Sequence, residues 1–314
     1  MRSQPANLTR SGGSPLFRTD LAVLAVAVVW GSSYVTAKTA LAFYPVFLFL
    51  FLRFAMTVVL LIPLTWRQLR SASMETWKIG GIFGVFLAVI FLLEMFGVSH
   101  TSASNAGFII SLCIVFLPVL DGLWQKRFPE PALLGAVALT VIGTGFLTLR
   151  GGYSFSLGDL LILGAAVVRA MFMLLSQRMT AGRRLDSAAL TTIQLAVVAI
   201  FTGAISVVNY PVESFFPPSG DIWLILLYQA VFCTMFAFYV QLAVIRQTSP
   251  TRVGILLGTE PLFSALFAVW IGGEQLTWSA MFGGLLILVA TYIGRYIEAA
   301  RQNNAIREER EKKA

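Results

Sequence analysis

The sequence predicts an all-α polytopic membrane protein with ten transmembrane helices, arranged as two inverted five-helix repeats around a central cavity. Apolar residues make up 57% of its 314 residues and charged residues only 12%, whereas soluble domains carry about 45–50% apolar and about 25% charged residues. The apolar residues form continuous runs, which is the pattern of membrane helices and not of the alternating strands of an outer-membrane barrel. Residues of one half of the chain also recur, in order, in the other half. The composition and the continuous runs exclude a soluble protein and a membrane barrel, and the recurrence predicts the two repeats.

Polar, glycine and proline residues divide the apolar runs into ten predicted helices. Each run is about long enough to cross ~30 Å of hydrocarbon, where a helix satisfies its own backbone hydrogen bonds. The first run follows a polar segment, and the later runs begin after short polar stretches or at a proline. In order, the predicted helices are Asp20–Leu41, Pro45–Trp66, Thr76–Val98, Ser102–Trp124, Pro131–Leu149, Leu157–Met179, Ser187–Val208, Ile222–Ile245, Pro250–Gly272 and Trp278–Ile297.

These runs define four parts of the chain. Residues 1–19 form a polar N-terminal segment, residues 20–150 the first five-helix repeat, residues 151–298 the second repeat, and residues 299–314 a charged tail. Because five is an odd number, the second repeat must be inverted in the membrane relative to the first. The N-terminal segment lacks the apolar stretch of a cleaved signal peptide, so we expect the first helix itself to direct insertion.

Lys and Arg residues predict the orientation, because cytoplasmic loops carry an excess of both. With the N-terminus in the cytoplasm, all but four of the 23 Lys and Arg residues fall in cytoplasmic segments. Lys38 and Arg150 fall on the other side, and Arg53 and Arg169 lie within predicted helices. We therefore expect both termini to be cytoplasmic. The net charge of +8 then reflects membrane topology and not a nucleic-acid surface.

Matching residues in the two halves indicate an internal duplication. Their common order and their nearly constant separation carry more weight than any single match. Inverted repeats are typical of secondary transporters, which bind their substrate near the bilayer midplane between the repeats. The pairs, whose separation grows slowly along the chain, are Asp20 with Asp159, Trp30 with Arg169, Trp77 with Trp223, Phe86 with Phe232, Thr101 with Thr248, Gly107 with Gly254 and Gly135 with Gly283.

Five short motifs carry a resemblance to a known family. They are Trp30-Gly31-Ser32-Ser33-Tyr34, Leu52-Arg53-Phe54, Gly158-Asp159, Glu260-Pro261 and Gly272-Gly273-Glu274. From Asp20 to Ile297 the chain resembles the drug/metabolite transporter superfamily in its ten-helix EamA-type branch, and most of all the YddG-type amino-acid exporters. This resemblance implies a secondary transporter that exports neutral or aromatic amino acids and related small metabolites across the bacterial inner membrane by alternating access. Because the internal duplication supplies both halves, we expect one chain to work as a monomer. Arg169 departs from the tryptophan that is usual in the family.

Charged residues at mid-depth in the predicted helices are candidate functional groups, because a charge in hydrocarbon is costly. Arg169 could form an ion pair with Glu260, or its planar guanidinium could bind a substrate carboxylate. Both interpretations are true if the substrate displaces Glu260. Arg53 is expected to form a structural ion pair with Glu94 at similar depth. Pro261 weakens the helix beside Glu260, which favours a hinge or a coupling role for these two residues, with a harmless kink as an equal alternative.

Aromatic and small polar residues at helical spacing predict the wall of a substrate pocket. A pocket with aromatic rings, a few hydroxyls, one amide and one arginine suits a small zwitterion with an apolar side chain. Packing or lipid contact is the alternative for most single members. The predicted substrate-binding residues are Trp30, Ser33, Tyr34, Phe83, Phe86, Asn105, Phe108, Ser111, Arg169, Tyr228, Phe232, Phe236 and Tyr239.

Several function classes lack their sequence signatures. The chain has no G-x-x-x-x-G-K-[ST] phosphate loop and no zinc-protease or serine-hydrolase motif, and its single histidine and two cysteines make no persuasive zinc site. We therefore expect no cofactor, no metal site, no nucleic-acid partner and no enzymatic activity. Export of a sugar, a nucleobase or a lipophilic drug stays open beside amino-acid export. A membrane-embedded enzyme and a receptor are weaker alternatives.

Overall fold

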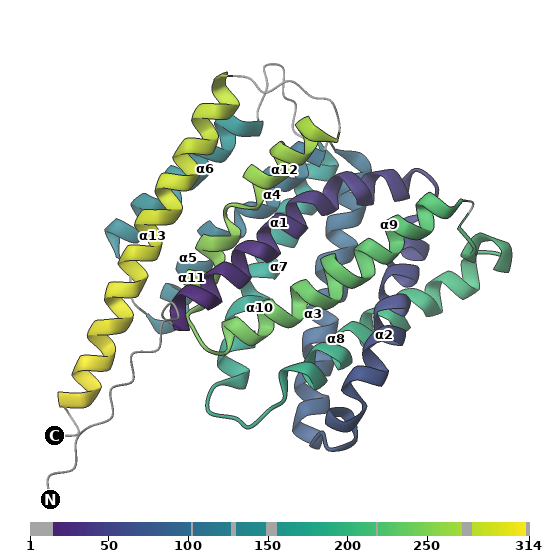
Figure 1. Ribbon diagram of the computed structural model, residues 1–314, viewed down its shortest axis with the longest axis horizontal. Helices are drawn as coiled ribbons and strands as arrows, with labels where there is room; N and C mark the ends of the chain where they lie inside the picture. The colour runs from purple at the N-terminus through teal and green to yellow at the C-terminus, as the bar shows by residue number, and fades with distance from the viewer. Residues whose placement is uncertain are drawn as a thin grey trace, which may run out of the picture.

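The computed structural model describes residues 15–101, 103–126, 130–148, 156–217, 219–271 and 278–311. Every element in these ranges is a helix (Figure 1). Most are α-helices, η1 is a short 3-10 helix, and η2 is a π-helical turn. The elements are α1 (Pro15–Leu41), α2 (Val46–Arg70), α3 (Met74–His100), α4 (Ala103–Ser111), α5 (Cys113–Gln125), α6 (Pro131–Thr148), α7 (Leu157–Thr180), α8 (Ser187–Asn209), η1 (Val212–Phe215), α9 (Gly220–Ala230), η2 (Val231–Phe236), α10 (Ala237–Ile245), α11 (Pro250–Leu257), α12 (Glu260–Trp270) and α13 (Trp278–Glu311).

Helices occupy the described part of each predicted run, but three runs are interrupted. The fourth run divides into α4 and α5 at Leu112, and the ninth divides into α11 and α12 at Gly258 and Thr259. In the eighth run, η2 joins α9 to α10. The two divisions lie at corresponding places in the two halves, because Leu112 and Thr259 are as far apart as the matched residues Thr101 and Thr248.

Six of the described helical segments are long and apolar enough to cross a membrane. They are α1, α2, α3, α7, α8 and the unit formed by α9, η2 and α10. Shorter apolar stretches lie in α4–α5, α6 and α13. The protein is therefore a multi-pass membrane protein, while the ten crossings stay a prediction. The helix α13 also runs beyond the predicted end at Ile297, because the charged tail continues it to Glu311.

Tryptophan side chains mark the ends of the helices. Tryptophan prefers the interface between hydrocarbon and water, because its ring is apolar and its N–H is polar. The seventh tryptophan, Trp30, is instead buried in the interior. The six exposed tryptophans each lie within one turn of a helix end, as expected for helices embedded in a bilayer. They are Trp66, Trp77, Trp124, Trp223, Trp270 and Trp278.

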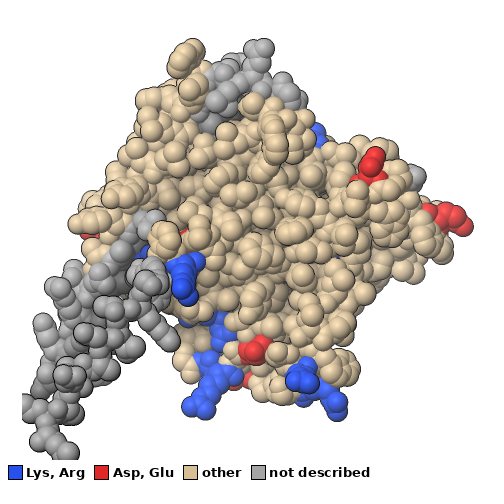
Figure 2. All heavy atoms as spheres, viewed as in Figure 1, with Lys and Arg blue, Asp and Glu red and all other residues tan. Residues whose placement is uncertain are grey.

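Charged side chains gather at the margins of the molecule. On the face shown in Figure 2, uncharged residues cover the middle, and most Lys and Arg atoms lie towards the lower margin. The helix α1 begins and α13 ends in the lower left part of the view in Figure 1. Arg67 and Arg70 lie in the last turn of α2, and Arg178 lies in the last turn of α7. The uncharged middle is the part that the hydrocarbon of a bilayer would cover.

Helices of the two halves pack against each other, and each contact has a counterpart between the corresponding helices of the opposite halves. The helix α3 packs against α7, and its counterpart, the α9–α10 unit, packs against α1. Likewise α4 and α5 pack against α7, and their counterparts α11 and α12 pack against α1. The last helices of each half, α6 and α13, pair with each other at one edge of the bundle (Figure 1). The interior therefore lies between the halves.

Two corresponding aspartates connect each half to the interrupted helix of the other half. Asp20 of α1 accepts hydrogen bonds of 2.9 Å from Nε and Nη2 of Arg252 in α11. Asp159 of α7 accepts a 2.7 Å hydrogen bond from Oγ1 of Thr101, just before α4, and caps its own helix through Ser156. Both carboxylates are buried, so each requires these partners.

Glycines at the contact between α3 and α8 let the two helices approach closely. A Cβ atom on Gly80 would lie 2.7 Å from Cγ2 of Ile193, and one on Gly84 would lie 2.5 Å from Cβ of Val197. The Gly84 position also faces the backbone oxygen of Gln194. This spacing of two glycines is therefore a close-packing motif of membrane helices.

We expect Gly84→Ala to destabilise the protein by about 1–3 kcal/mol, because the added methyl group overlaps Val197 and the backbone of α8. Gly81→Ala, on the same helix, is the control, since nothing lies within 4 Å of a Cβ atom there. Thermal unfolding in detergent measures both variants. Equal melting temperatures for the two would contradict this packing.

Candidate functional site

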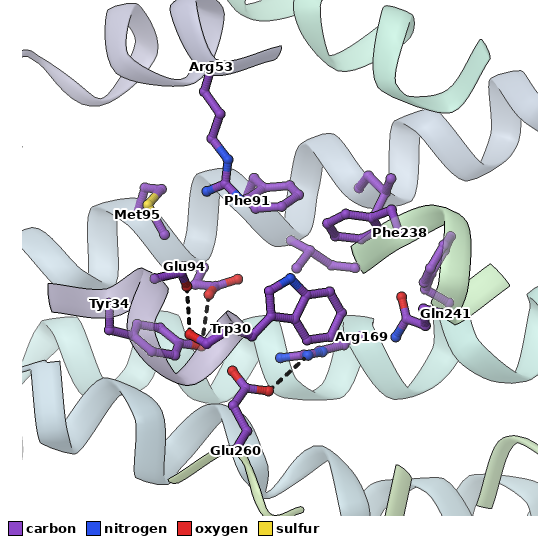
Figure 3. Close-up of a pocket in the computed structure, with 14 residues that line it drawn as sticks. Trp30, Tyr34, Arg53, Phe91, Glu94, Met95, Arg169, Phe238, Gln241 and Glu260 are labelled. Atoms are coloured by element: carbon purple, nitrogen blue, oxygen red, sulfur yellow. Dashed lines mark hydrogen bonds and ion pairs between the residues drawn. The ribbon is translucent and has the colours of Figure 1, made fainter. Parts of the chain in front are cut away.

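A cavity lies in the middle of the bundle, between the two halves (Figure 3). The first half contributes residues of α1, α2 and α3, and the second half contributes residues of α7, α10 and α12. The cavity thus combines four charged groups, two of each sign, with aromatic and aliphatic walls. It is lined by Trp30, Ser33, Tyr34, Arg53, Leu87, Ile90, Phe91, Glu94, Met95, Arg169, Phe172, Phe238, Gln241 and Glu260.

Arg169, near the centre of α7, is neutralised by Glu260. Its Nη2 atom lies 3.2 Å from Oε2 of Glu260, and both side chains are buried. The guanidinium also stacks on Trp30, 4.4 Å from the ring centroid, in a cation–π contact. Trp30 and Arg169 are the matched residues of the two halves, so corresponding positions meet at the centre. The ion pair that the sequence suggested is present, and a carboxylate-binding role for Arg169 stays a prediction.

The interruption between α11 and α12 positions Glu260. The helix α11 ends at Leu257 and α12 begins at Glu260, followed by Pro261, which has no amide hydrogen for the helical ladder. Glu260 therefore lies in the first turn of α12, where the helix dipole favours a carboxylate. The weakened helix expected near Pro261 is thus a two-residue break between α11 and α12, at Gly258 and Thr259, where the backbone stays in the right-handed helical region. Movement at this point stays a prediction.

The π-helical turn η2 holds two cavity residues in place. In a π-turn the backbone hydrogen bonds join residues five apart, whereas in an α-helix they join residues four apart. The carbonyl oxygen of Cys233 accepts hydrogen bonds from Nε1 of Trp30 at 2.9 Å and from Nη2 of Arg53 at 3.3 Å. Oγ1 of Thr234 accepts from Nε of Arg53 at 2.7 Å and donates to the backbone oxygen of Gln229 at 2.8 Å. The turn therefore fixes Trp30 and Arg53 together.

Arg53 and Glu94 face the same cavity but do not form the predicted ion pair. No carboxylate oxygen in the described part of the chain lies within 4.0 Å of an Arg53 nitrogen. Glu94 instead accepts a 3.0 Å hydrogen bond from the Tyr34 hydroxyl. The prediction fails because similar depth in two helices does not set side-chain direction, and η2 turns the guanidinium of Arg53 towards itself.

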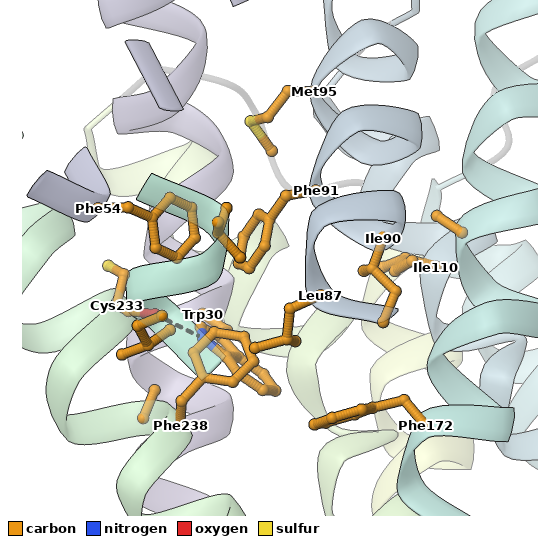
Figure 4. Close-up of a cluster of buried hydrophobic side chains, with 14 of the residues drawn as sticks. Trp30, Phe54, Leu87, Ile90, Phe91, Met95, Ile110, Phe172, Cys233 and Phe238 are labelled. Atoms are coloured by element: carbon orange, nitrogen blue, oxygen red, sulfur yellow. Dashed lines mark hydrogen bonds between the residues drawn. The ribbon is translucent and has the colours of Figure 1, made fainter. Parts of the chain in front are cut away.

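Aromatic rings form one wall of the cavity (Figure 4). Phe91 of α3 packs edge-on against Phe54 of α2, with ring centroids 4.8 Å apart. On its other side Phe91 lies 5.5 Å from Phe238 of α10, which in turn lies 5.3 Å from Trp30. Tilted and edge-on contacts of this kind are the favoured arrangements of aromatic rings. The charged groups therefore face a continuous apolar wall.

Some sequence-predicted residues line the cavity and others do not. Phe83 is buried against Phe172, with ring centroids 5.6 Å apart, and Ser111 is buried at the end of α4. Phe86 packs against the core without lining the cavity. Lining residues are Trp30, Ser33, Tyr34, Arg53, Glu94, Arg169 and Glu260. Outside the described residues lie the side chains of Asn105 and Phe108 and the motif Gly272-Gly273-Glu274.

The aromatic stripe predicted for the eighth helix does not face the cavity. An extra residue in a π-turn rotates all later residues by about 100° relative to an unbroken α-helix. After the turn, Phe238 and Gln241 line the cavity, whereas Tyr239 is 44% exposed. Phe232, within the turn, is 49% exposed. The stripe members outside the lining are Tyr228, whose hydroxyl is hydrogen-bonded to that of Ser32, Phe232, Phe236 and Tyr239.

Sequence reasoning missed four aromatic or polar lining residues, Phe91, Phe172, Phe238 and Gln241. Phe91 carried a usable signal, because Leu87, Phe91 and Glu94 are spaced as one helical face. Phe238 and Gln241 carried none, because their face depends on the π-turn before them. Hydrophobic periodicity assumes an uninterrupted helix, so it assigns the wrong face after such a turn.

The sequence model of the EamA-like transporter family matches this chain twice, over residues 17–149 and 156–294. The chain belongs to the EamA-like transporter family. Each half therefore matches the same family, in agreement with the corresponding contacts between the halves. Membership of the EamA-like family points to a membrane transporter of small metabolites. In the described ranges, no group of three His, Cys, Asp or Glu residues could hold a metal ion.

Related EamA-like proteins match nearly the whole chain. An uncharacterized transporter of Archaeoglobus fulgidus is 29% identical over 281 residues, which are 87% of this chain and 84% of the relative. The uncharacterized transporter YvbV of Bacillus subtilis is 27% identical over 293 residues, 88% of this chain and 91% of the relative. A solved crystal structure is similar with a TM-score of 0.74 at 17% identity, covering 90% of this chain and 98% of that chain, which shows a shared fold.

We expect Glu260→Leu to destabilise the EamA-like bundle by about 3–5 kcal/mol, because it leaves the Arg169 guanidinium buried without its counter-ion. The double variant Arg169→Met with Glu260→Leu removes both charges and should recover most of this loss, since a buried ion pair replaced by apolar residues is often neutral. Unfolding by denaturant in detergent micelles measures the difference. A double variant no more stable than Glu260→Leu would show that the pair does not neutralise Arg169.

Proposed function

We propose that this protein is a secondary transporter that exports neutral or aromatic amino acids and related small metabolites. The observation that carries the proposal is the composition of the central cavity. Charged groups of both signs stand opposite a wall formed by Phe91, Phe238 and Trp30. Such a cavity suits a small molecule with a zwitterionic end and an apolar side chain, because each end meets groups of matching chemistry.

The arrangement of the two halves supports alternating access as the mechanism. In transporters built from inverted repeats, the substrate site lies where the repeats meet, and the repeats rock around it. Here both halves contribute three helices to the cavity, and the interrupted helices α4–α5 and α11–α12 occupy corresponding places. We infer that the second half is inverted relative to the first. Because one chain holds both halves, a monomer suffices.

Glu260 and Pro261 are the proposed hinge or coupling element. Glu260 stands at the interruption of the ninth predicted helix and bonds to Arg169 of α7, in the same half of the chain, beside Trp30 of the other half. An interrupted helix supplies the freedom of movement that a continuous helix lacks. A change in the angle between α11 and α12 would therefore move Glu260 together with the cavity wall to which Arg169 belongs.

The proposed location is the bacterial inner membrane, with both termini in the cytoplasm. The excess of Lys and Arg in the segments assigned to the cytoplasm supports this orientation. The beginning of α1, the end of α2 and the end of α13 carry such residues, and they lie at the same end of the molecule (Figure 1). Export rather than import follows from the resemblance to amino-acid exporters.

An uncharged ring-bearing metabolite such as a nucleobase is the second candidate substrate. The side-chain amide of Gln241 lines the cavity together with the ring of Phe238. An amide beside an aromatic wall can bind a planar ring with donor and acceptor groups. Amino acids remain the first candidate, because a nucleobase carries no charged groups to meet Arg53 and Glu94, which do not pair with each other.

Counterflow into liposomes tests the proposed substrate. We expect liposomes that contain the protein and unlabelled L-phenylalanine to accumulate external labelled L-phenylalanine, whereas liposomes without protein should not. Phe238→Ala should raise the half-saturating concentration about tenfold, because it removes an apolar contact with the substrate side chain. Phe201→Ala, an exposed phenylalanine of α8, is the control. Accumulation of a nucleobase but of no amino acid would favour the second candidate.

Thiol labelling of intact cells tests the proposed orientation. We expect Glu213→Cys to react with a membrane-impermeant maleimide from outside, and Ser71→Cys to react only after the membrane is permeabilised. Both positions are exposed, and the native Cys113 and Cys233 are buried, so they should give little background. The reverse labelling pattern would place the termini on the outer side.

A further inference from the structure

We propose that Arg53 and Glu94 form a divided charge pair that a zwitterionic substrate bridges, with its carboxylate on Arg53 and its ammonium group on Glu94. This inference rests on the proposed function and names the groups that hold the charged end of the substrate. It also reassigns the carboxylate-binding role, which the sequence gave as one possibility for Arg169, to the other arginine of the cavity.

Arg53 differs from the other buried arginines in what neutralises it. Among the described residues three arginines are buried, and Arg169 and Arg252 each form an ion pair, with Glu260 and Asp20 respectively. Arg53 is 3% exposed, yet no carboxylate of a described residue lies within 4.0 Å of it. A guanidinium stays charged even when buried, and a charge at this depth without a counter-ion in direct contact is costly. The position therefore calls for an anion.

The hydrogen bonds of Arg53 leave one edge of the guanidinium available. Its Nε atom donates to Oγ1 of Thr234 and its Nη2 atom donates to the carbonyl oxygen of Cys233. No described residue accepts a hydrogen bond from Nη1, and Arg53 lines the cavity. Both acceptors are neutral, so they orient the guanidinium without neutralising it. A carboxylate in the cavity would supply the missing charge through a short charge-assisted hydrogen bond.

Glu94 likewise lacks a positively charged partner in direct contact among the described residues. Its side chain is 9% exposed and lines the cavity, and its described hydrogen-bond donor is the neutral hydroxyl of Tyr34, which bonds to Oε1. No described Lys or Arg nitrogen lies within 4.0 Å of this carboxylate. A substrate ammonium group, with three N–H donors and a positive charge, would satisfy both its hydrogen-bonding and its charge.

The position of the two groups suits an α-amino acid. In Figure 3 the guanidinium of Arg53, from α2, and the carboxyl group of Glu94, from α3, point into the same space beside Phe91. The Arg53 guanidinium lies 5.0 Å from the centroid of the Phe91 ring. Phe91 continues into the aromatic wall through Phe238. A substrate that bridges Arg53 and Glu94 can therefore lay an apolar side chain along this wall, while Arg169 stays paired with Glu260.

Competition by three related compounds tests the divided pair. The probes are L-phenylalanine, its carboxamide, which lacks the negative charge, and its N-acetyl derivative, which lacks the positive charge. Each competes with labelled L-phenylalanine in counterflow and in direct binding to the purified protein. We expect the wild-type protein to prefer the amino acid over each derivative by about 10- to 100-fold, the value of one charged hydrogen bond.

The two single variants should each lose one preference and keep the other. Arg53→Gln should bring the carboxamide within about threefold of the amino acid and keep the preference over the N-acetyl derivative, because it removes one charge of the site. Glu94→Gln should do the reverse, and its amide oxygen can still accept the Tyr34 hydrogen bond. Arg246→Gln is the matched control. Arg246 also bonds to a hydroxyl and a backbone oxygen, those of Ser187 and Leu185, but it lies outside the cavity.

Variants of Thr234 keep the test decisive if Arg53→Gln fails to fold. Thr234→Val removes the acceptor that orients Arg53 and should weaken binding of the amino acid but not of its carboxamide, whereas Thr234→Ser should restore it. Thr202→Val is the control for loss of a buried hydroxyl, because Thr202 bonds only to the backbone of its own helix.

Three results would contradict the divided pair, the proposed transport of amino acids, or both. If Arg53→Gln and Glu94→Gln both keep both preferences, the divided pair is refuted while the proposed transport of amino acids stands. If the wild-type protein binds phenylalanine with both charge preferences but gives no counterflow, the divided pair stands and the proposed transport fails. If it neither binds nor exchanges phenylalanine, both are refuted.

Discussion

The structure depends on neutralising charge in the middle of a membrane-embedded bundle. Arg169 stands where the two halves meet, and it is tolerated there because Glu260 pairs with it at 3.2 Å and Trp30 covers its face. Each of the three residues comes from a different helix, α7, α12 and α1. Their contact therefore ties the halves together at the depth where an unpaired charge would be most costly. The helices around this point enclose the cavity.

Irregular backbone provides the polar groups that regular helices withhold. In a continuous helix the carbonyl oxygens accept hydrogen bonds from N–H groups of the same helix. The π-helical turn η2 instead offers the Cys233 oxygen to Trp30 and Arg53, and the interruption before α12 places Glu260 at a helix start. Such departures are tolerated at membrane depth where they line a cavity. In this protein they lie next to the same cavity, so the functional groups and the irregular backbone coincide.

The two halves share a plan but differ in chemistry at matched positions. Trp30 and Arg169 correspond, yet one is an indole and the other a guanidinium, and they stack on each other. Asp20 forms an ion pair with Arg252, whereas the corresponding Asp159 accepts hydrogen bonds from Thr101 and its own capping residue. A duplicated frame thus encloses a cavity whose two sides are not equivalent. An asymmetric site of this kind can receive an asymmetric ligand in one orientation.

The sequence by itself determined the membrane class, the helical architecture and the matching halves, and it offered the Arg169–Glu260 pair as one of the open alternatives. These follow from composition, from run length and from the cost of a charge in hydrocarbon, all of which are local or additive properties. Only the tertiary structure decided that Arg53 and Glu94 stay apart and that Phe238, not the stripe through Phe232, faces the cavity. Both depend on the π-turn, whose single extra residue rotates the rest of its helix and redirects a guanidinium on another helix, and periodicity cannot register that change.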